Sequence, residues 1–328
     1  MAVLIRSTGA FVPEHRCSND EITKIVDTTD DWIRSHTGIE ARRVAPDGML
    51  TSDLALGAAR DALRKAGVGP DKIDFIVVAT ATPDYFGFPS TACIVQDGLG
   101  AAEAAAFDVV AGCTGFIYAA DTASAMLEVR RGRYALAIGA EILTRVADWS
   151  DRASCVLFGD GAGCVLLERV EGESDRGILA SILGSDGSGA RDLYLAQAAR
   201  DRTFHRGEPY PEFPKIVMNG RNVYNFAVKA ITKLIEDLLV KSGIPLGEFR
   251  WIIPHQANLR IVQAAAKRFG LPEERFYMNI QEYANTSAAS VPIALNEIVE
   301  RSLLSAGDLI MLLGFGAGLT FGGSVIRY

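Results

Sequence analysis

The chain has 328 residues, of which 49% are hydrophobic and 22% charged, a composition typical of a folded globular protein that excludes extensive disorder. Its 40 acidic and 33 basic side chains give a formal net charge of -7, so it lacks the positive field that nucleic acids attract. No run of 18 apolar residues occurs and the opening MAVLIRSTGAFVPEH is too weakly apolar for a signal peptide, so a cytoplasmic location is expected.

The cysteines point to free thiols. Their number is odd, and no C-x-x-C pair occurs, which argues against both a disulfide framework and a zinc site. The five are Cys17, Cys93, Cys113, Cys155 and Cys164.

Short β-rich segments alternate with longer helical ones along the first half of the chain. The order is IDFIVVAT at 73–80, FPSTACIVQDGL at 88–99, AAFDVV at 105–110, a helical segment after Cys113, and YALAIGAE at 134–141. This alternation predicts βαβ units whose parallel strands are buried on both faces.

The segment after Cys113 is small or apolar until EVRRG, which predicts a buried helix that begins near Thr114 and ends at Arg130 and Arg131, before Gly132. Cys113 then lies at the N-cap or in the first turn. A helix N-terminus stabilises an anion by up to ~2 kcal/mol, enough to bring the pKa of a thiol close to neutrality. The sequence alone also allows the simpler interpretation that Cys113 is a small buried hydrophobe.

The second half repeats the first. DKIDFIVVATA at 71–81 parallels GEFRWIIPHQA at 247–257, IVQDGLG parallels IVQAAAKRFG, and FDVV parallels FYMN. These correspondences predict an α/β fold of two duplicated βαβαβ halves. We place the halves at 1–172 and 173–328, on either side of a boundary within the polar RVEGESDRG.

Two polar residues of the second half are candidate partners for the cysteine. His255 follows the strand-like WII, and Pro254 indicates that this strand has ended. Ligands of open α/β sheets bind beyond the carboxyl ends of strands, where His255 is expected. Asn285 precedes a second helix of small residues, and the repeat aligns Cys113 with Ala288. A loop histidine, and a helix-capping or glycosylated asparagine, are the alternatives.

Six segments, in order and spacing, resemble the β-ketoacyl-acyl-carrier-protein synthase III family, the initiating condensing enzymes of bacterial fatty-acid synthesis within the thiolase superfamily. The resemblance implies a thiolase-like fold of α-β-α-β-α layers, with the nucleophile in the N-terminal half and the His and Asn in the C-terminal half. The segments are TTDDWIRSHTGIEARR, GCTGF, FGDGAG, PHQANLRI, NTSAAS and GFGAGLTFGGSVIRY.

The resemblance also implies a reaction. Cys113 accepts the acyl group of an acyl-CoA, malonyl-acyl carrier protein then loses CO2, and the resulting carbanion attacks the acyl-Cys113 thioester. His255 and Asn285 donate hydrogen bonds to the enolate oxygen, and the backbone N–H groups of Cys113 and Ala317 hold the tetrahedral oxyanion. Acyl-CoA is a substrate in this scheme, and neither a cofactor nor a metal is implied.

Further residues are assigned to substrate binding by the same resemblance. Trp32 and Arg152 match a pair that sandwiches the adenine of CoA, whereas His36 and Asn225 depart from the arginine and lysine common at their positions. Phe88 matches a residue that reaches across a homodimer into the partner's acyl pocket. Further CoA-lining positions are Thr28, Gly220 and Asn258.

A basic helix face is the expected docking surface for the acidic carrier protein. Arg260, Lys267 and Arg268 are spaced to share one side of the helix after PHQAN. Without the resemblance, a solvated helix face explains the same spacing.

Other functions account for less of the sequence. A papain-type protease also has Cys, His and Asn in this chain order, but its C-G-S-C-W context is missing and the duplicated βαβ pattern is foreign to it. A noncatalytic scaffold has no need for three polar groups where the halves converge. A related acyltransferase or a polyketide starter ketosynthase with the same triad stays the alternative.

Overall fold

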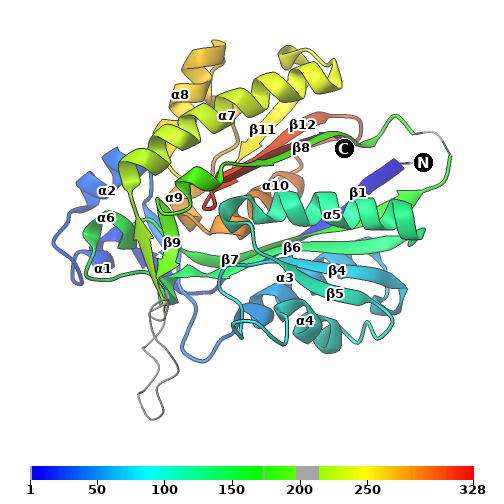
Figure 1. Cartoon of the computed structure of the whole chain (residues 1–328), viewed down its shortest axis with the longest axis horizontal. Helices are drawn as coiled ribbons and strands as arrows, with labels where there is room; N and C mark the ends of the chain where they lie inside the picture. The colour runs from blue at the N-terminus through cyan, green and yellow to red at the C-terminus, as the bar shows by residue number, and fades with distance from the viewer. Residues whose placement is uncertain (1, 173, 197–213) are drawn as a thin grey trace.

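Two β-sheets and three layers of helices make up the molecule (Figure 1). The computed structural model describes residues 2–172, 174–196 and 214–328. Within those ranges, no helix combines the length and the apolar character that crossing a membrane requires.

The first sheet has the strand order β1-β7-β6-β4-β5, in which β4 is parallel to β5 and β6 while β7 is antiparallel to β6 and β1. Its core strands β4 and β6 are almost wholly buried, as their continuous apolar runs predict. The strands are β1 (Ala2–Phe11), β4 (Ile73–Ala79), β5 (Ala105–Val109), β6 (Tyr134–Ile142) and β7 (Asp160–Val170).

The second sheet has the order β11-β12-β13-β8, with β11 parallel to β12 and the other pairs antiparallel. Its strands are β8 (Gly177–Ser185), β11 (Phe249–Pro254), β12 (Leu309–Gly316) and β13 (Thr320–Arg327). Two small antiparallel pairs complete the strands: β2 (Arg16–Ser18) with β3 (Ala41–Arg43), and β9 (Leu193–Ala196) with β10 (Lys215–Met218).

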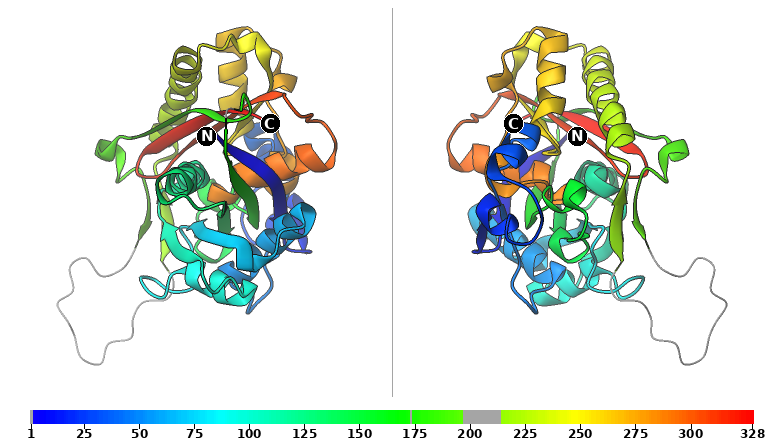
Figure 2. Two further views of the ribbon diagram at one scale, coloured as in Figure 1. Left: turned by 90° about the vertical axis from the view of Figure 1, so that its right-hand side faces the viewer. Right: turned by 90° about the vertical axis from the view of Figure 1, so that its left-hand side faces the viewer.

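The helices cover both outer faces and fill the space between the sheets (Figures 1 and 2). The outer layer on the first sheet is α3 (Thr51–Ala66) and α4 (Thr91–Leu99), and that on the second is α7 (Gly220–Ser242) and α8 (Leu259–Phe269). Between the sheets lie α5 (Gly115–Arg130) and α10 (Ser290–Glu300). Shorter helices are α1 (Asn19–Ile22), α2 (Asp30–Thr37), α6 (Arg152–Cys155) and α9 (Ile280–Tyr283).

The two sheets repeat one arrangement, since β1, β7, β6 and β4 correspond in order to β8, β13, β12 and β11. In the second half, the position equivalent to β5 is occupied by an isolated β-bridge between Ile252 and Phe276. Strand β7 ends at Val170 and β8 begins at Gly177, on either side of the polar link. The division into halves at residue 172 stays a prediction.

The parallel pairing predicted for the βαβ segments is confirmed in β4, β5 and β6, whereas β7 and β13, whose direction was not predicted, run antiparallel to their neighbours. Residues 317–319 alone connect β12 to β13, and a link that short reverses the chain. Between β6 and β7 the chain turns back at the strand ends and places no crossover helix along the sheet. Strands β7 and β13, each second from one edge of its sheet, are therefore antiparallel to β6 and β12.

Two sequence details also differ. Helix α5 ends at Arg130, as predicted, but the residue that caps it in the left-handed conformation is Arg131, with a φ of 59°, and not Gly132. Gly132 instead packs so closely that a Cβ there would lie 2.9 Å from the side chains of Asp74 and Phe75. Pro254 does not follow β11 but is its last residue, paired with Leu313.

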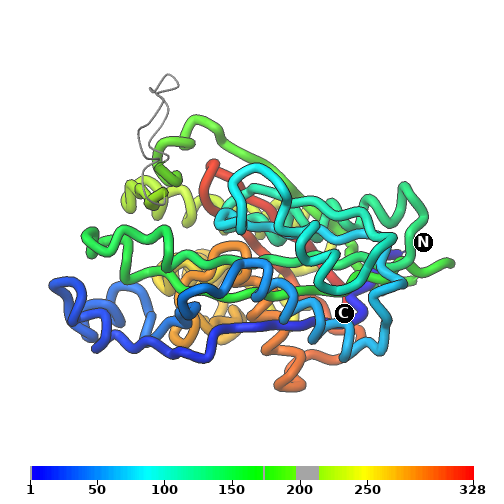
Figure 3. The backbone as a smooth tube through the Cα atoms, turned by 90° about the horizontal axis from the view of Figure 1, so that it is seen from below, coloured from blue at the N-terminus to red at the C-terminus, as the bar shows by residue number. Residues whose placement is uncertain are grey.

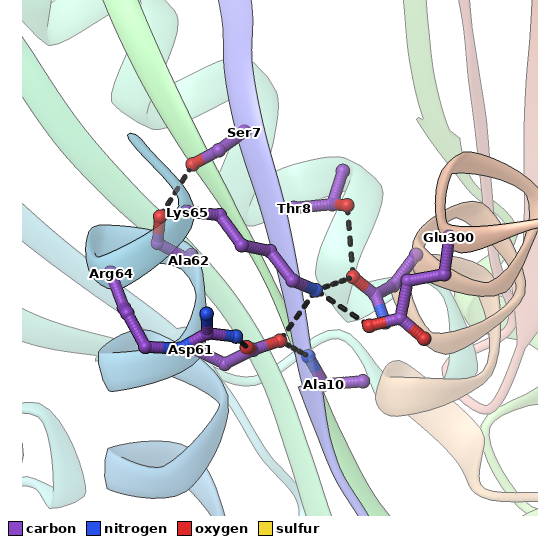
Figure 4. Close-up of polar contacts among 9 residues, drawn as sticks. Ser7, Thr8, Ala10, Asp61, Ala62, Arg64, Lys65 and Glu300 are labelled. Carbon is purple, nitrogen blue, oxygen red and sulfur yellow. Dashed lines mark hydrogen bonds and ion pairs between the residues drawn. The ribbon is translucent and has the colours of Figure 1, made fainter. Parts of the chain in front are cut away.

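A polar cluster fastens α10 of the second half to β1 and α3 of the first (Figure 4). Lys65 Nζ contacts Asp61 at 2.7 Å, Asn296 at 2.9 Å and Glu300 at 2.7 Å. Thr8 Oγ1 donates to the same Asn296 side chain at 2.9 Å. In the view of Figure 3 the two chain ends lie on the same side of the molecule.

Candidate active site

Cys113 lies in a one-turn 3-10 helix, η2 (Gly112–Thr114), that leads directly into α5. Gly112 has a φ of 51°, in the left-handed region that glycine adopts at no steric cost. A Cβ on Gly112 would lie 3.0 Å from that of Ala317, and one on Gly316 would lie 3.0 Å from Cys113 Sγ. The two glycines therefore allow the end of β12 to approach the cysteine backbone.

Burial raises the pKa of the Cys113 thiol to about 11. A hydrogen bond from the Ser287 side chain and the backbone N–H groups of Ala317 and Cys113 oppose this rise, whereas the charge of Glu141 adds to it. This direction is opposite to the lowered pKa expected at a helix N-terminus, because the loss of hydration is the largest effect on the thiol. Cys113 therefore rests as a thiol, whose proton must be removed before the sulfur can act as a nucleophile.

His255 directly follows β11 in the other half and is buried. Its backbone N–H donates to Leu313 O at 2.7 Å, and its ring meets that of Phe315 edge-on with centroids 5.5 Å apart. Nδ1 lies 2.7 Å from Ser290 Oγ, which is itself 2.8 Å from Ser287 O. Burial lowers the pKa of His255 to about 3, so the imidazole is neutral at physiological pH.

Asn285 lies between α9 and a second 3-10 turn, η7 (Ser287–Ala289). Its backbone N–H donates to Leu157 O at 2.9 Å, and its carbonyl accepts from Gly159 N–H at 3.0 Å. Its Oδ1 accepts from Ser287 N–H at 2.8 Å. Since Oδ1 is used in this way, Nδ2 is the donor group that Asn285 offers to the cavity it lines.

Cys113, His255 and Asn285 line one cavity of about 240 Å³. Turn η2 precedes α5 and turn η7 precedes α10, and the two turns contact each other as equivalent parts of the duplicated halves. The first half supplies the sulfur and the second supplies the imidazole and the amide. Their catalytic roles stay predictions, but the side chains share one site.

Comparison with known proteins decides the family. The family model for 3-oxoacyl-[acyl-carrier-protein] synthase III matches residues 107–187, and its C-terminal counterpart matches 239–328. A β-ketoacyl-[acyl-carrier-protein] synthase III of Clostridium tetani is 46% identical, covering 99% of this chain and 98% of the relative. The chain belongs to the β-ketoacyl-acyl-carrier-protein synthase III family.

Solved structures agree with this assignment. The crystal structure of the 3-oxoacyl-[acyl-carrier-protein] synthase III of Aquifex aeolicus VF5 matches with a TM-score of 0.91 and 41% identity, covering 99% of this chain and 100% of that one. The priming β-ketosynthase of the R1128 polyketide pathway also gives a TM-score of 0.91, at 32% identity, over 99% of this chain and 96% of that one. The predicted family, thiolase-like fold and condensing acyltransferase class of fatty-acid synthesis are confirmed.

The lining of the synthase III cavity includes Trp32 and His36. His36 stacks on Trp32 with ring centroids 4.5 Å apart, and Arg152 lies 5.0 Å from the Trp32 ring centroid. Arg152 also donates to Asp27 O at 2.8 Å. Because a cation already contacts the indole, adenine enters between Trp32 and Arg152 only if the guanidinium moves away.

Two of the other predicted CoA contacts line the same cavity, and the third lies outside its lining. Asn258 caps α8 by accepting from Arg260 N–H at 2.9 Å, and its Nδ2 donates to His36 O at 3.0 Å. Asn258 and Gly220 line the cavity, whereas Thr28 stands next to Asp27 with a buried hydroxyl that has no hydrogen-bond partner among the described residues. These contacts stay predictions.

A second, smaller cavity of about 70 Å³ is also lined by Cys113. Apolar side chains dominate its lining, which includes Ala81, Leu143, Leu195 and Ile216. Cys113, Phe158 and Leu193 line both cavities, so the sulfur is accessible from each of them.

Phe88 and the basic helix face lie on the surface. Phe88 is 91% exposed, and its neighbours Tyr85 and Phe86 are exposed as well. On α8, Arg260, Lys267 and Arg268 are all exposed, and so is Asn225 on α7. Two of the basic side chains already have partners: Arg260 donates to Ser35 O at 3.0 Å, and Arg268 lies 3.4 Å from Glu236.

The sequence interpretation missed three polar residues around the triad: Glu141, Ser287 and Ser290. Glu141 ends the buried segment YALAIGAE, and an acid at the carboxyl end of a buried strand was a signal for it. The two serines belong to NTSAAS, but no spacing in the sequence indicates where their hydroxyls point.

Proposed function

We propose that Cys113 takes the acyl group of an acyl-CoA primer and that the protein condenses it with malonyl-acyl carrier protein to give a β-ketoacyl-acyl carrier protein and CO2. The observation that carries this proposal is the shared cavity of Cys113, His255 and Asn285. A thioester carbonyl placed there meets a sulfur nucleophile from one half and neutral hydrogen-bonding groups from the other.

Acylation of Cys113 places negative charge on the carbonyl oxygen in the tetrahedral intermediate. The backbone N–H groups of Cys113 and Ala317 both point toward the sulfur, so they lie close to where that oxygen forms. Only backbone atoms act here, which is why alanine suffices at position 317. The smaller, mainly apolar cavity that Cys113 also lines suits the hydrocarbon end of a short acyl group.

Decarboxylation of the malonyl group places charge on a thioester oxygen, and Asn285 Nδ2 and His255 Nε2 are the donors proposed for it. For Nε2 to carry the proton, Nδ1 must accept one hydrogen bond. The Ser290 hydroxyl, 2.7 Å from Nδ1, is the donor available for this. A neutral imidazole also avoids the cost of a buried cation.

The test is to incubate the protein with a panel of acyl-CoAs and measure the mass added to the Cys113 peptide. Malonyl-acyl carrier protein is then added, and the β-ketoacyl product is measured. We expect both events in the wild type and neither in Cys113→Ala, while Cys93→Ala, which removes an exposed free thiol, is the matched control. Absence of an adduct on Cys113 with every acyl-CoA would overturn the mechanism.

A second candidate, the starter ketosynthase of a polyketide pathway, is favoured by the similarity to the R1128 priming enzyme. The same chemistry serves both functions, so the carrier protein distinguishes them. Faster condensation with a polyketide carrier protein than with the fatty-acid carrier protein would favour this candidate.

We also propose a homodimer and a carrier-docking face. An almost fully exposed phenylalanine at position 88 is costly unless another surface covers it, and a second subunit is the proposed cover. Lys267, together with the partly engaged Arg260 and Arg268, is the proposed carrier contact. Monomers in sedimentation experiments, or salt-independent condensation after charge reversal of all three, would contradict these assignments.

A further inference from the structure

Ser287 joins three parts of the site although its backbone is strained. Its φ is 48°, a left-handed conformation that costs energy for a residue with a side chain. The Asn285 side chain holds its N–H at 2.8 Å. Its side chain is near enough to the Cys113 sulfur and to the Glu141 carboxylate to lower the pKa of both groups, and Ser287 and Cys113 line the same small cavity. The strained conformation thus places one hydroxyl between the nucleophile and a buried acid.

Glu141 is the acid at the other end of this contact and has no exposed surface. One oxygen accepts from Thr82 Oγ1 at 2.7 Å, and both accept from Ala81 N–H, at 3.1 and 3.2 Å. Turn η7 packs directly on β6, where a Cβ on Gly139 would lie 2.1 Å from Ala288 O. The packing leaves Glu141 facing Ser287 rather than water.

We propose that Glu141 is the proton acceptor of Cys113 and that the Ser287 hydroxyl relays the proton. The Cys113 S–H donates to Ser287 Oγ while the Ser287 O–H donates to the carboxylate, so both protons move one step toward Glu141. This inference rests on the acyl-Cys113 intermediate of the proposed function.

Charge balance favours this acceptor. The relay moves one negative charge from Glu141 to Cys113, so the buried site carries the same charge before and after. Transfer to His255 instead creates two charges from two neutral groups, which burial penalises. The pKa values rank the two acceptors in the same order. Burial raises the pKa of Glu141 to about 7 and lowers that of His255 to about 3, so the carboxylate is the stronger base.

The proton is accounted for through both half-reactions. In acylation the Cys113 S–C bond forms, the C–S bond to CoA breaks, the thiol proton rests on Glu141, and the departing CoA thiolate takes a proton from water. In condensation the carbanion displaces Cys113, and Glu141 returns its proton through Ser287 to the released sulfur. Glu141 is therefore neutral while the enolate carries its negative charge.

The groups around Glu141 limit what else titrates with it. Cys113 faces it from η2, and the remaining polar neighbours from β6, η7 and the loop after β4 are hydroxyls and backbone amides. They are Thr80, Thr82 and Ser287 with the N–H groups of Ala81 and Ala288. A proton taken up near neutral pH by this group therefore belongs to Glu141.

The test is the rate at which iodoacetamide alkylates the Cys113 peptide of the full chain from pH 5.5 to 9, with no acyl-CoA present. In the wild type we expect the rate to rise through pH 7 and level off. Glu141→Gln is expected to lose this rise and to react at least tenfold more slowly at pH 8. Ser287→Ala keeps the carboxylate but breaks the relay, and the same loss is expected.

The sign of the Glu141→Gln effect separates a proton acceptor from a mere charge. The Glu141 carboxylate raises the pKa of Cys113, so removing a charge that does nothing else speeds alkylation. Faster alkylation in Glu141→Gln, or an unchanged pH profile in Ser287→Ala, overturns the relay. Thr82→Val is the matched control: it removes another hydrogen bond to the carboxylate, so the rise moves to higher pH but persists.

Acylation by acyl-CoA distinguishes this inference from the proposed function. If both variants are alkylated slowly but the wild type forms no acyl adduct, the relay stands and the proposed function is wrong. Normal acylation rates in both variants retain the function and reject the relay.

Discussion

The hydroxyl of Ser290 lies 2.7 Å from Nδ1 of His255, so the direction of this buried hydrogen bond and the tautomer of the imidazole depend on each other. The same hydroxyl is 2.8 Å from Ser287 O, and it donates to only one of the two acceptors at a time. When it donates to Nδ1, the Nε2–H of His255 points into the cavity as a donor.

Ser290→Ala is expected to slow malonyl decarboxylation about tenfold while leaving the acylation of Cys113 within twofold, because acylation does not use the His255 donor. Ser290→Thr keeps the hydroxyl and is expected to restore most of the rate. Single-turnover measurements of both steps check this. Equal losses in the two steps would show that Ser290 only maintains the fold.

Decarboxylation is expected to vary less than twofold between pH 5 and 6.5. His255, with a pKa lowered to about 3, stays neutral in this range, and Glu141, with a pKa of about 7, stays mostly protonated. A histidine with its ordinary pKa of about 6.5 would instead lose more than tenfold toward pH 5 as the imidazole becomes charged. CO2 release by Cys113→Ala, which cannot be acylated, is the measurement.

Glu141→Gln is expected to stabilise the protein at pH 8 by about 3 kcal/mol and to change stability little at pH 4.5. The folded pKa of Glu141 is raised, so its proton is held more tightly in the folded state. The wild type therefore loses stability as the pH rises from the unfolded pKa toward 7, and glutamine cannot titrate. Urea unfolding of the wild type and the variant at pH 8 and pH 4.5 checks the sign of this effect. If the two proteins differed in unfolding free energy by the same amount at both pH values, the prediction would be wrong.

Trp32→Ala is expected to raise the KM for acyl-CoA about tenfold with kcat within threefold, because the indole on α2 is proposed to bind the adenine and not the reacting thioester. Arg152→Ala removes one proposed adenine contact but also frees one face of the Trp32 indole. It is therefore expected to raise the KM for acyl-CoA by less than Trp32→Ala does. An equal fall in kcat and kcat/KM for Trp32→Ala would place the indole in the chemical step instead.

Periodicity and repetition predicted much of the fold. The apolar runs identified β4 and β6, and the duplicated motifs placed η2 and η7 at equivalent positions. The antiparallel direction of β7 and β13 was not predicted because strand direction depends on where a connection runs, which local residue patterns do not encode.

The sequence predicted the positions of the main site residues but not the protonation of Cys113. The positions of Cys113, His255 and Asn285 at strand ends and turns were evident from motifs. The high pKa of Cys113 was not, because it arises from the packing of residues distant in sequence around the sulfur. Glu141 and Ser287 were missed for the same reason, since they meet only when η7 lies on β6.

The face-to-face turns η2 and η7 also couple reactivity to assembly. In the proposed reaction the sulfur comes from one half and the donors for the enolate come from the other, so condensation requires that both sheets have docked around α5 and α10. A partly folded chain that exposes Cys113 has a thiol of ordinary pKa that acyl-CoA can still acylate. Such a chain is expected to hold the acyl group without passing it on, so misfolded enzyme would accumulate as an inert thioester.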